Sequence, residues 1–195
     1  MLFASFAPTY GIGPENVPPG TEVGQLYPGI DEGAVYRMFT SMFIHYGVLH
    51  LLLNMWALWV LGRPLEAVLG PLRFAALYLL AGLGGSVACY VFTPNAIAAG
   101  ASGAIFGLFA ALFIVLKRLR RDTSSVIPVI LINLVLTFTI PNISIAGHLG
   151  GFVIGGLVAL GLVYAPRSAR TAVQAVTVGG IAVLLAAITA TAMLM

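Results

Sequence analysis

The chain has 195 residues, of which 60% are hydrophobic and only 8% are charged, and its mean hydropathy is +1.05. A soluble globular domain has about 25% charged residues. The polar surface is therefore too small for a water-soluble enzyme, a disordered chain or a nucleic-acid-binding protein. Long continuous apolar runs favour helices over the alternating strands of a membrane β-barrel. We expect an all-α, polytopic membrane protein with a single domain over residues 1–195.

Residues 1–10 are apolar but cover only half a membrane span, and we interpret them as the end of a first helix whose beginning is missing. Residues 11–41 are rich in proline and glycine at first and are expected to form an outer loop. A spanning helix needs about 20 mostly apolar residues. Six later segments meet this description, namely Met42–Leu61, Leu72–Phe92, Ser102–Leu119, Ser125–Ile140, Gly147–Tyr164 and Thr171–Met195.

The basic residues predict how these spans are oriented. Eight of the nine Lys and Arg residues lie in alternate connections, after the first, third and fifth predicted spans. They are Arg63, Arg73, Lys117, Arg118, Arg120, Arg121, Arg167 and Arg170. Basic connections of membrane proteins face the cytoplasm. Residues 11–41 and the C-terminus are therefore expected on the outer side.

Polar residues inside membrane spans indicate function. His50 and Asn54 are four positions apart, about 40° around a helix, so they share one face. The purely structural interpretation of such a pair is a hydrogen-bonding contact between helices. His45 lies about 140° from His50 on the same predicted helix. We expect it to point elsewhere, at the water boundary, in a structural role.

Ser102 lies in the segment Gly100-Ala-Ser-Gly103 at the start of a predicted span. A lone serine in a span is usually a packing residue, but flanking glycines would let a substrate backbone approach its hydroxyl closely. The unpaired N–H groups at a helix N-terminus would also face a developing oxyanion. The sequence therefore makes Ser102 a candidate nucleophile.

His148 precedes Gly151 and Gly155 on the same helix face. Stripes of small residues let two helices pack closely, and Gly103 and Gly107 form a matching stripe on the span that Ser102 begins. Contact between the two stripes would bring His148 beside Ser102. A neighbouring imidazole that accepts the serine proton makes the serine a strong nucleophile.

The acidic residues lie either in the outer loop or on the basic side of the predicted membrane, as Glu66 and Asp122 do. We therefore expect a Ser–His dyad without a carboxylate. Phe106 lies one turn below Ser102 on the same face. It would either stack on the His148 ring or fill the core.

Together these motifs resemble the rhomboid family of intramembrane serine proteases, from about Tyr36 to Tyr164. The resemblance includes Arg37 in the outer loop, His45, His50 and Asn54 in one run, and Glu66 in the first inner loop. The remaining motifs are Gly100-Ala-Ser-Gly103 and Gly147-His-Leu-Gly-Gly151.

The resemblance implies that Ser102 is the nucleophile and His148 the general base and acid. It implies an oxyanion hole formed by His50, Asn54 and the Ser102 backbone N–H. Phe106 matches a position that is often a tyrosine stacked on the catalytic histidine. The implied fold is a six-helix core, here with a truncated first helix, core helices over residues 42–164 and an additional C-terminal helix over residues 171–195.

The implied activity is cleavage of transmembrane segments of other membrane proteins near the outer leaflet of a bacterial-type plasma membrane. The expected partners are those segments and the lipid bilayer, with no cofactor, no metal and no nucleic acid. A catalytically inactive relative that binds transmembrane clients is the alternative. A transporter would need charged residues at mid-depth. A zinc protease would need a pattern such as His-Glu-x-x-His, which the sequence lacks.

Overall fold

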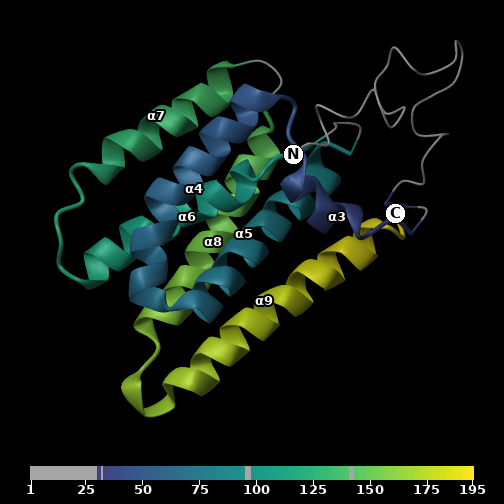
Figure 1. Ribbon diagram of the computed structural model, residues 1–195. Coiled ribbons are helices and arrows are strands. Elements are labelled where there is room, and N and C mark those ends of the chain that lie inside the picture. Colours follow the sequence, from purple (N-terminus) through teal and green to yellow (C-terminus); the bar gives the residue numbers. More distant parts are fainter. Residues whose placement is uncertain (1–29, 32, 95–97, 141–142) are drawn as a thin grey trace, which may run out of the picture.

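The computed structural model describes residues 30–31, 33–94, 98–140 and 143–195. In these ranges the chain forms helices and no strand. Figure 1 shows α6 and α8 in the middle of the bundle, α7 along one edge and α9 along the opposite edge. The long helices are α4 (Val48–Leu69), α5 (Pro71–Phe92), α6 (Ser102–Arg118), α7 (Val126–Thr139), α8 (Ile145–Tyr164) and α9 (Arg170–Ala192). The short elements are α3 (Arg37–Thr40), η2 (Ser41–Phe43) and η3 (Arg167–Ala169).

Within the described ranges, four helical segments are long and apolar enough to cross a membrane, namely Val48–Leu69, Pro71–Phe92, Ile145–Tyr164 and Arg167–Ala192. Helices α6 and α7 are shorter, with 17 and 14 residues, which correspond to about 25 and 21 Å. Helix α7 ends at Thr139, and Ile140 is extended, as is usual for a residue before proline. The predicted all-α membrane bundle is confirmed, although two of the six predicted spans form shorter helices than the others.

The prediction of a first span over Met42–Leu61 is wrong at both ends. Helix α4 begins only at Val48, because the preceding Gly47 is extended. It then continues through Pro64 to Leu69 and ends at Gly70, whose φ of +83° favours glycine. The Gly70 N–H closes the helix by donating to the Glu66 carbonyl oxygen at 2.8 Å. Glu66 therefore lies exposed in the last turns of α4, and not in an inner loop as predicted.

The end of the predicted outer loop is helical and joined to the bundle. Arg37 begins α3, and its neighbour Met38 is buried. The Ser86 hydroxyl of α5 donates to the Met38 carbonyl oxygen at 2.8 Å. Residues 1–10, interpreted as the end of a first helix, and most of residues 11–41 lie outside the described residues.

Glycines let α6 and α8 pack with their backbones in contact. A Cβ atom on Gly151 would lie 2.6 Å from the Gly103 carbonyl carbon, and one on Gly155 would lie 2.8 Å from the Gly107 carbonyl oxygen. Both distances are too short for a real side chain, so Gly151 and Gly155 can hold only glycine at this helix spacing. We call Gly103, Gly107, Gly151 and Gly155 the glycine seam. It places the beginning of α6 beside the beginning of α8.

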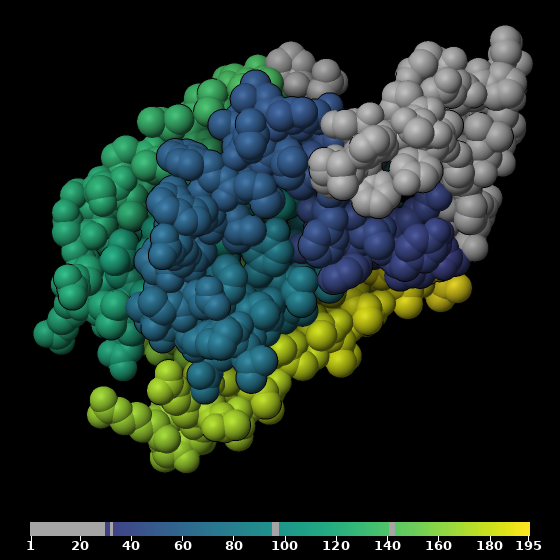
Figure 2. Space-filling model, viewed as in Figure 1, coloured from purple at the N-terminus to yellow at the C-terminus, as the bar shows by residue number. Residues whose placement is uncertain are grey.

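Helix α9 is attached to the bundle by a buried amide. Gln174 Oε1 accepts a bond from Arg73 Nε at 2.7 Å, and Gln174 Nε2 donates to the Leu162 carbonyl oxygen of α8 at 2.7 Å. Figure 2 shows α4 across the centre of one face, with α7 along one edge and α9 along the other. The added C-terminal helix is thus joined to both α5 and α8.

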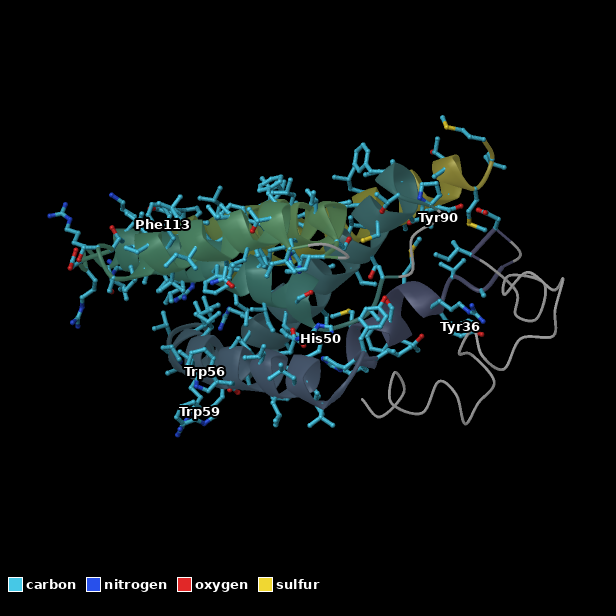
Figure 3. All side chains as sticks on the ribbon, turned by 90° about the horizontal axis from the view of Figure 1, so that it is seen from above. Tyr36, His50, Trp56, Trp59, Tyr90 and Phe113 are labelled. Carbon is cyan, nitrogen blue, oxygen red and sulfur yellow. The ribbon has the colours of Figure 1, made fainter. Side chains whose placement is uncertain are left out.

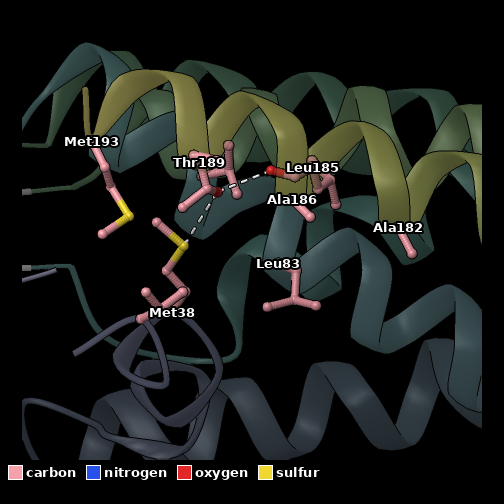
Figure 4. Close-up of a pocket in the computed structure, with 10 residues that line it drawn as sticks. Met38, Leu83, Ala182, Leu185, Ala186, Thr189 and Met193 are labelled. Atoms are coloured by element: carbon pink, nitrogen blue, oxygen red, sulfur yellow. Dashed lines mark hydrogen bonds between the residues drawn. The ribbon is translucent and has the colours of Figure 1, made fainter. Parts of the chain in front are cut away.

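A cavity of about 320 Å³ lies among α3, α5 and α9 (Figure 4). Its lining is apolar apart from Thr189, whose hydroxyl donates to the Leu185 carbonyl oxygen at 2.9 Å. None of the described residues that line it is titratable. We therefore assign this cavity no part in the chemistry.

Candidate active site

Ser102 and His148 meet where α6 and α8 begin. Ser102 is the first residue of α6, and His148 lies in the first turn of α8, where the Ser144 side chain caps the helix by accepting a bond from the Gly147 N–H at 3.1 Å. Ser102 Oγ lies 2.9 Å from His148 Nε2. This is the distance expected between a nucleophile and its general base.

The other ring nitrogen of His148 has a partner that the sequence analysis missed. Thr137 Oγ1, on α7, lies 2.8 Å from His148 Nδ1. The same oxygen lies 2.8 Å from the Asn133 carbonyl oxygen one turn earlier. Thr137 is only 2% exposed. The sole sign of it in the sequence is a hydroxyl side chain in an apolar segment, 11 residues before His148.

The Phe106 ring covers one face of the His148 imidazole. The two ring centroids are 4.1 Å apart and the rings are inclined by only 16°. Phe109 meets the Phe106 ring edge-on, with centroids 5.9 Å apart. Stacking between Phe106 and His148 leaves the imidazole little freedom to tilt, while its two nitrogens contact hydroxyl groups.

His50 lies in the first turn of α4 with its ring against Gly100. A Cβ atom on Gly100 would lie 2.9 Å from His50 Nε2, and the Gly100 φ of +117° also favours glycine. The Tyr46 backbone N–H donates to His50 Nδ1 at 3.3 Å. Because a neutral imidazole has one N–H and one acceptor nitrogen, the His50 proton lies on Nε2, on the Gly100 side.

Asn54 is buried one turn below His50. Its amide nitrogen donates to the His50 carbonyl oxygen at 2.8 Å. An amide nitrogen has two N–H groups, so a second donor remains for a ligand. Figure 3 shows His50 on the inner side of α4, whereas Trp56 and Trp59 lie on its outer side.

The prediction that His45 points away from His50 is wrong. His45 precedes α4 and is 2% exposed, and its ring meets the His50 ring edge-on with centroids 5.1 Å apart. It does not point away from His50, because the two residues do not share a helix. Burial lowers the pKa of His45, and the neighbouring His50 lowers it further. The neutral His45 ring therefore packs behind His50.

A small second cavity of about 40 Å³ lies beside the dyad. Such a volume holds a water molecule or two. Its polar lining residues are Ser41, Ser86, Cys89, Ser102, Ser144 and His148. The Cys89 thiol and the Ser144 hydroxyl are 3.0 Å apart and can bond to each other. The described residues contain no cluster of three His, Cys, Asp or Glu side chains placed to hold a metal ion.

The Rhomboid domain family matches residues 32–165, which is more than half of the chain. The chain belongs to the rhomboid family. The predicted family is thereby confirmed, and this rhomboid is an integral, multi-pass membrane protein.

Several curated proteins resemble this rhomboid over its core. "Rhomboid protease GluP" of Bacillus subtilis is 41% identical over 144 residues, which are 71% of this chain and 28% of that protein. "RHOMBOID-like protein 1" of Arabidopsis thaliana is 37% identical over 143 residues, 68% of this chain and 35% of that protein. "Putative rhomboid protease YdcA" of Bacillus subtilis is 34% identical over 139 residues, 66% of this chain and 70% of that protein. The chain thus spans well under half the length of the first two relatives.

Proposed function

We propose that this rhomboid is an intramembrane serine endopeptidase that cleaves transmembrane segments near the outer leaflet. The observation that carries the proposal is the 2.9 Å contact between Ser102 Oγ and His148 Nε2. The printed names of two relatives, "Rhomboid protease GluP" and "Putative rhomboid protease YdcA", support it. The buried surroundings of His148 also suit a base that acts out of bulk water.

In the proposed first step, Ser102 Oγ attacks the scissile carbonyl carbon and its proton passes to His148 Nε2. The carbonyl oxygen becomes an oxyanion that accepts bonds from the Ser102 N–H, the His50 Nε2–H and the remaining Asn54 N–H. The carbon–nitrogen bond then breaks, and His148 gives its proton to the leaving amine. In the second step a water attacks the acyl ester and His148 accepts the water's proton. The bond between the acyl carbon and Ser102 Oγ then breaks, and His148 gives this proton to Ser102 Oγ.

The proposed substrates follow from the need to expose a peptide bond. A spanning helix keeps its carbonyl groups in hydrogen bonds, so the cleaved segment must unwind locally. Gly and Pro near the cut, and Ser to a lesser degree, make unwinding easier because they favour helix less than alanine does. The family resemblance implies a small residue before the cut.

The proposed outer location follows from the distribution of charge along α6. Ser102 begins this helix, and Lys117 and Arg118 are in its last turn, about 23 Å away along the axis. Arg73 lies in the first turn of α5. This turn follows directly on the C-terminal end of α4, whereas His50 lies at the N-terminal end of α4. If basic ends face the cytoplasm, the dyad lies toward the outer side.

The proposal is tested with purified protein in liposomes that also contain a single-pass reporter with Ala-Gly near its outer end. We expect cleavage near that dipeptide and no inhibition by EDTA. Reporter binding without cleavage would favour the alternative of an inactive client-binding protein. Activity that is lost in EDTA and regained with zinc would contradict the serine mechanism.

Replacing Asn54 with Ala should lower kcat by about 10²- to 10³-fold with little change in KM. The amide would bind the oxyanion and not the ground-state carbonyl, and loss of one such donor has this effect in other serine proteases. The measurement is reporter cleavage in liposomes at several reporter densities.

Asn133→Ala is the matched control for Asn54→Ala. Asn133 donates to the carbonyl oxygen four residues earlier at 2.8 Å, as Asn54 does, but this bond is exposed, whereas Asn54 is buried. The substitution changes only the Asn133 side chain and keeps its backbone carbonyl oxygen, which is bonded to Thr137. This control should keep the wild-type kcat. Equal losses in the two variants would contradict an oxyanion role for Asn54.

A further inference from the structure

We infer that Thr137 is a positioning residue that holds His148 in the tautomer able to accept the Ser102 proton. The inference rests on the proposed function of Ser102 and His148. It adds a third side chain to the dyad, and this side chain comes from α7, a helix to which the sequence analysis assigned no functional residue.

The positions of the protons follow from the acceptors around Thr137. The Asn133 carbonyl oxygen, 2.8 Å from Thr137 Oγ1, can only accept a bond. The single hydroxyl proton of Thr137 therefore points at Asn133. Thr137 Oγ1 must then accept the bond that joins it to His148 Nδ1 at 2.8 Å, so Nδ1 carries a proton.

A neutral imidazole has one N–H, so a proton on Nδ1 leaves a lone pair on Nε2. His148 Nε2 faces Ser102 Oγ at 2.9 Å. The hydroxyl of Ser102 is thus the donor and the imidazole the acceptor, which is the arrangement that proton transfer requires. With the opposite tautomer, Nε2–H would point at Ser102 and no base would be present.

A threonine inside a helix often donates its hydroxyl to the carbonyl oxygen four residues earlier, and this bond usually has no role beyond the helix itself. Thr139 shows this ordinary case, because its hydroxyl donates to the Val135 carbonyl oxygen at 2.9 Å and its side chain is exposed. Thr137 differs in its second contact, to a titratable ring, and in its burial. Only Ile130 and Thr137 of α7 are buried. Displacement of α7 from α8 would therefore break the Thr137–His148 contact.

The experiment compares Thr137→Val, Thr137→Ser and the matched control Thr139→Val in liposomes. Valine keeps the shape of threonine without its oxygen, and serine keeps the oxygen. We expect Thr137→Val to lower kcat roughly 10- to 100-fold with KM unchanged, since Nδ1–H would lose its acceptor in a buried site. Thr137→Ser should recover most of the activity, and Thr139→Val should behave as wild type.

Nitrogen NMR of protein labelled at histidine reads the tautomer directly and independently of activity. The chain has only three histidines, and a His148→Ala spectrum identifies which signals belong to His148. At a pH where the ring is neutral, wild type, Thr137→Ser and Thr139→Val should show a protonated Nδ1 and a bare Nε2. Thr137→Val should lose this preference.

A wild-type ring with its proton on Nε2 would overturn the inference, and this result needs no variant to fold. So would Thr137→Val with wild-type kcat, or equal losses in Thr137→Val and Thr139→Val. If wild-type protein cleaves no reporter, the proposed function fails, and the wild-type spectrum still decides which nitrogen Thr137 holds protonated.

Discussion

Replacing Ser102 or His148 with alanine is expected to abolish cleavage of a transmembrane reporter, lowering kcat by at least about 10⁴-fold. Without Ser102 no acyl-enzyme can form, and without His148 the serine keeps its proton. Because the two groups act as one unit, the double variant should be no less active than either single variant. The measurement is cleavage in liposomes under single-turnover conditions.

Ser125→Ala is the control for these variants. Ser125 precedes α7, is exposed, and makes no side-chain cap bond, so this variant should cleave at the wild-type rate. All variants should unfold at the wild-type temperature, which separates loss of chemistry from loss of structure. Residual cleavage above about one hundredth of the wild-type rate in Ser102→Ala would show that another nucleophile acts.

Gly151→Ala is expected to destabilise the protein by about 2–3 kcal/mol and to lower kcat of the folded protein about 100-fold. The new Cβ would lie 2.6 Å from the Gly103 carbonyl carbon and 2.9 Å from its Cα. Backbone atoms cannot rotate away, so α6 and α8 must separate. That separation also moves His148 from Ser102, and a displacement of about 1 Å can reduce catalysis 10²-fold.

Gly179→Ala is the same substitution at a position where the new Cβ has no neighbour within 4 Å. It should leave kcat unchanged and stabilise α9 by up to about 1 kcal/mol, since alanine favours helix more than glycine does. Thermal unfolding in detergent micelles and reporter cleavage measure both effects. Equal unfolding temperatures and equal kcat values for Gly151→Ala and Gly179→Ala would contradict backbone contact across the glycine seam.

The all-α bundle was predictable because long apolar runs with few charges allow little else. The ends of α4 were not predictable from the sequence. Gly62 and Pro64 look like the end of a helix, but Gly62 lies where Phe74 of α5 packs closely, and a Cβ there would be 3.1 Å from the Phe74 ring. Beyond Pro64, burial of Leu65 and Leu69 keeps the chain helical. These tertiary contacts outweigh the local signals.

The sequence pattern around Ser102 and His148 led to both residues, because glycines at helical spacing predict which helix faces meet. Thr137 could not be found in this way. Helix α7 is apolar on nearly every side, so no periodicity indicates which face turns toward α8. His45 was misjudged because its angle to His50 was taken from a helix that begins only after it. The catalytic roles of these residues remain predictions.

The central claim is that His148 activates Ser102 as a nucleophile. Mass spectrometry of the protein after treatment with a fluorophosphonate, a reagent that phosphonylates activated serines, tests this claim most directly. We predict one phosphonyl group per chain, on Ser102, and far slower labelling in His148→Ala. Labelling of a different serine, no labelling of the folded wild-type protein, or equal labelling rates with and without His148 would contradict the account.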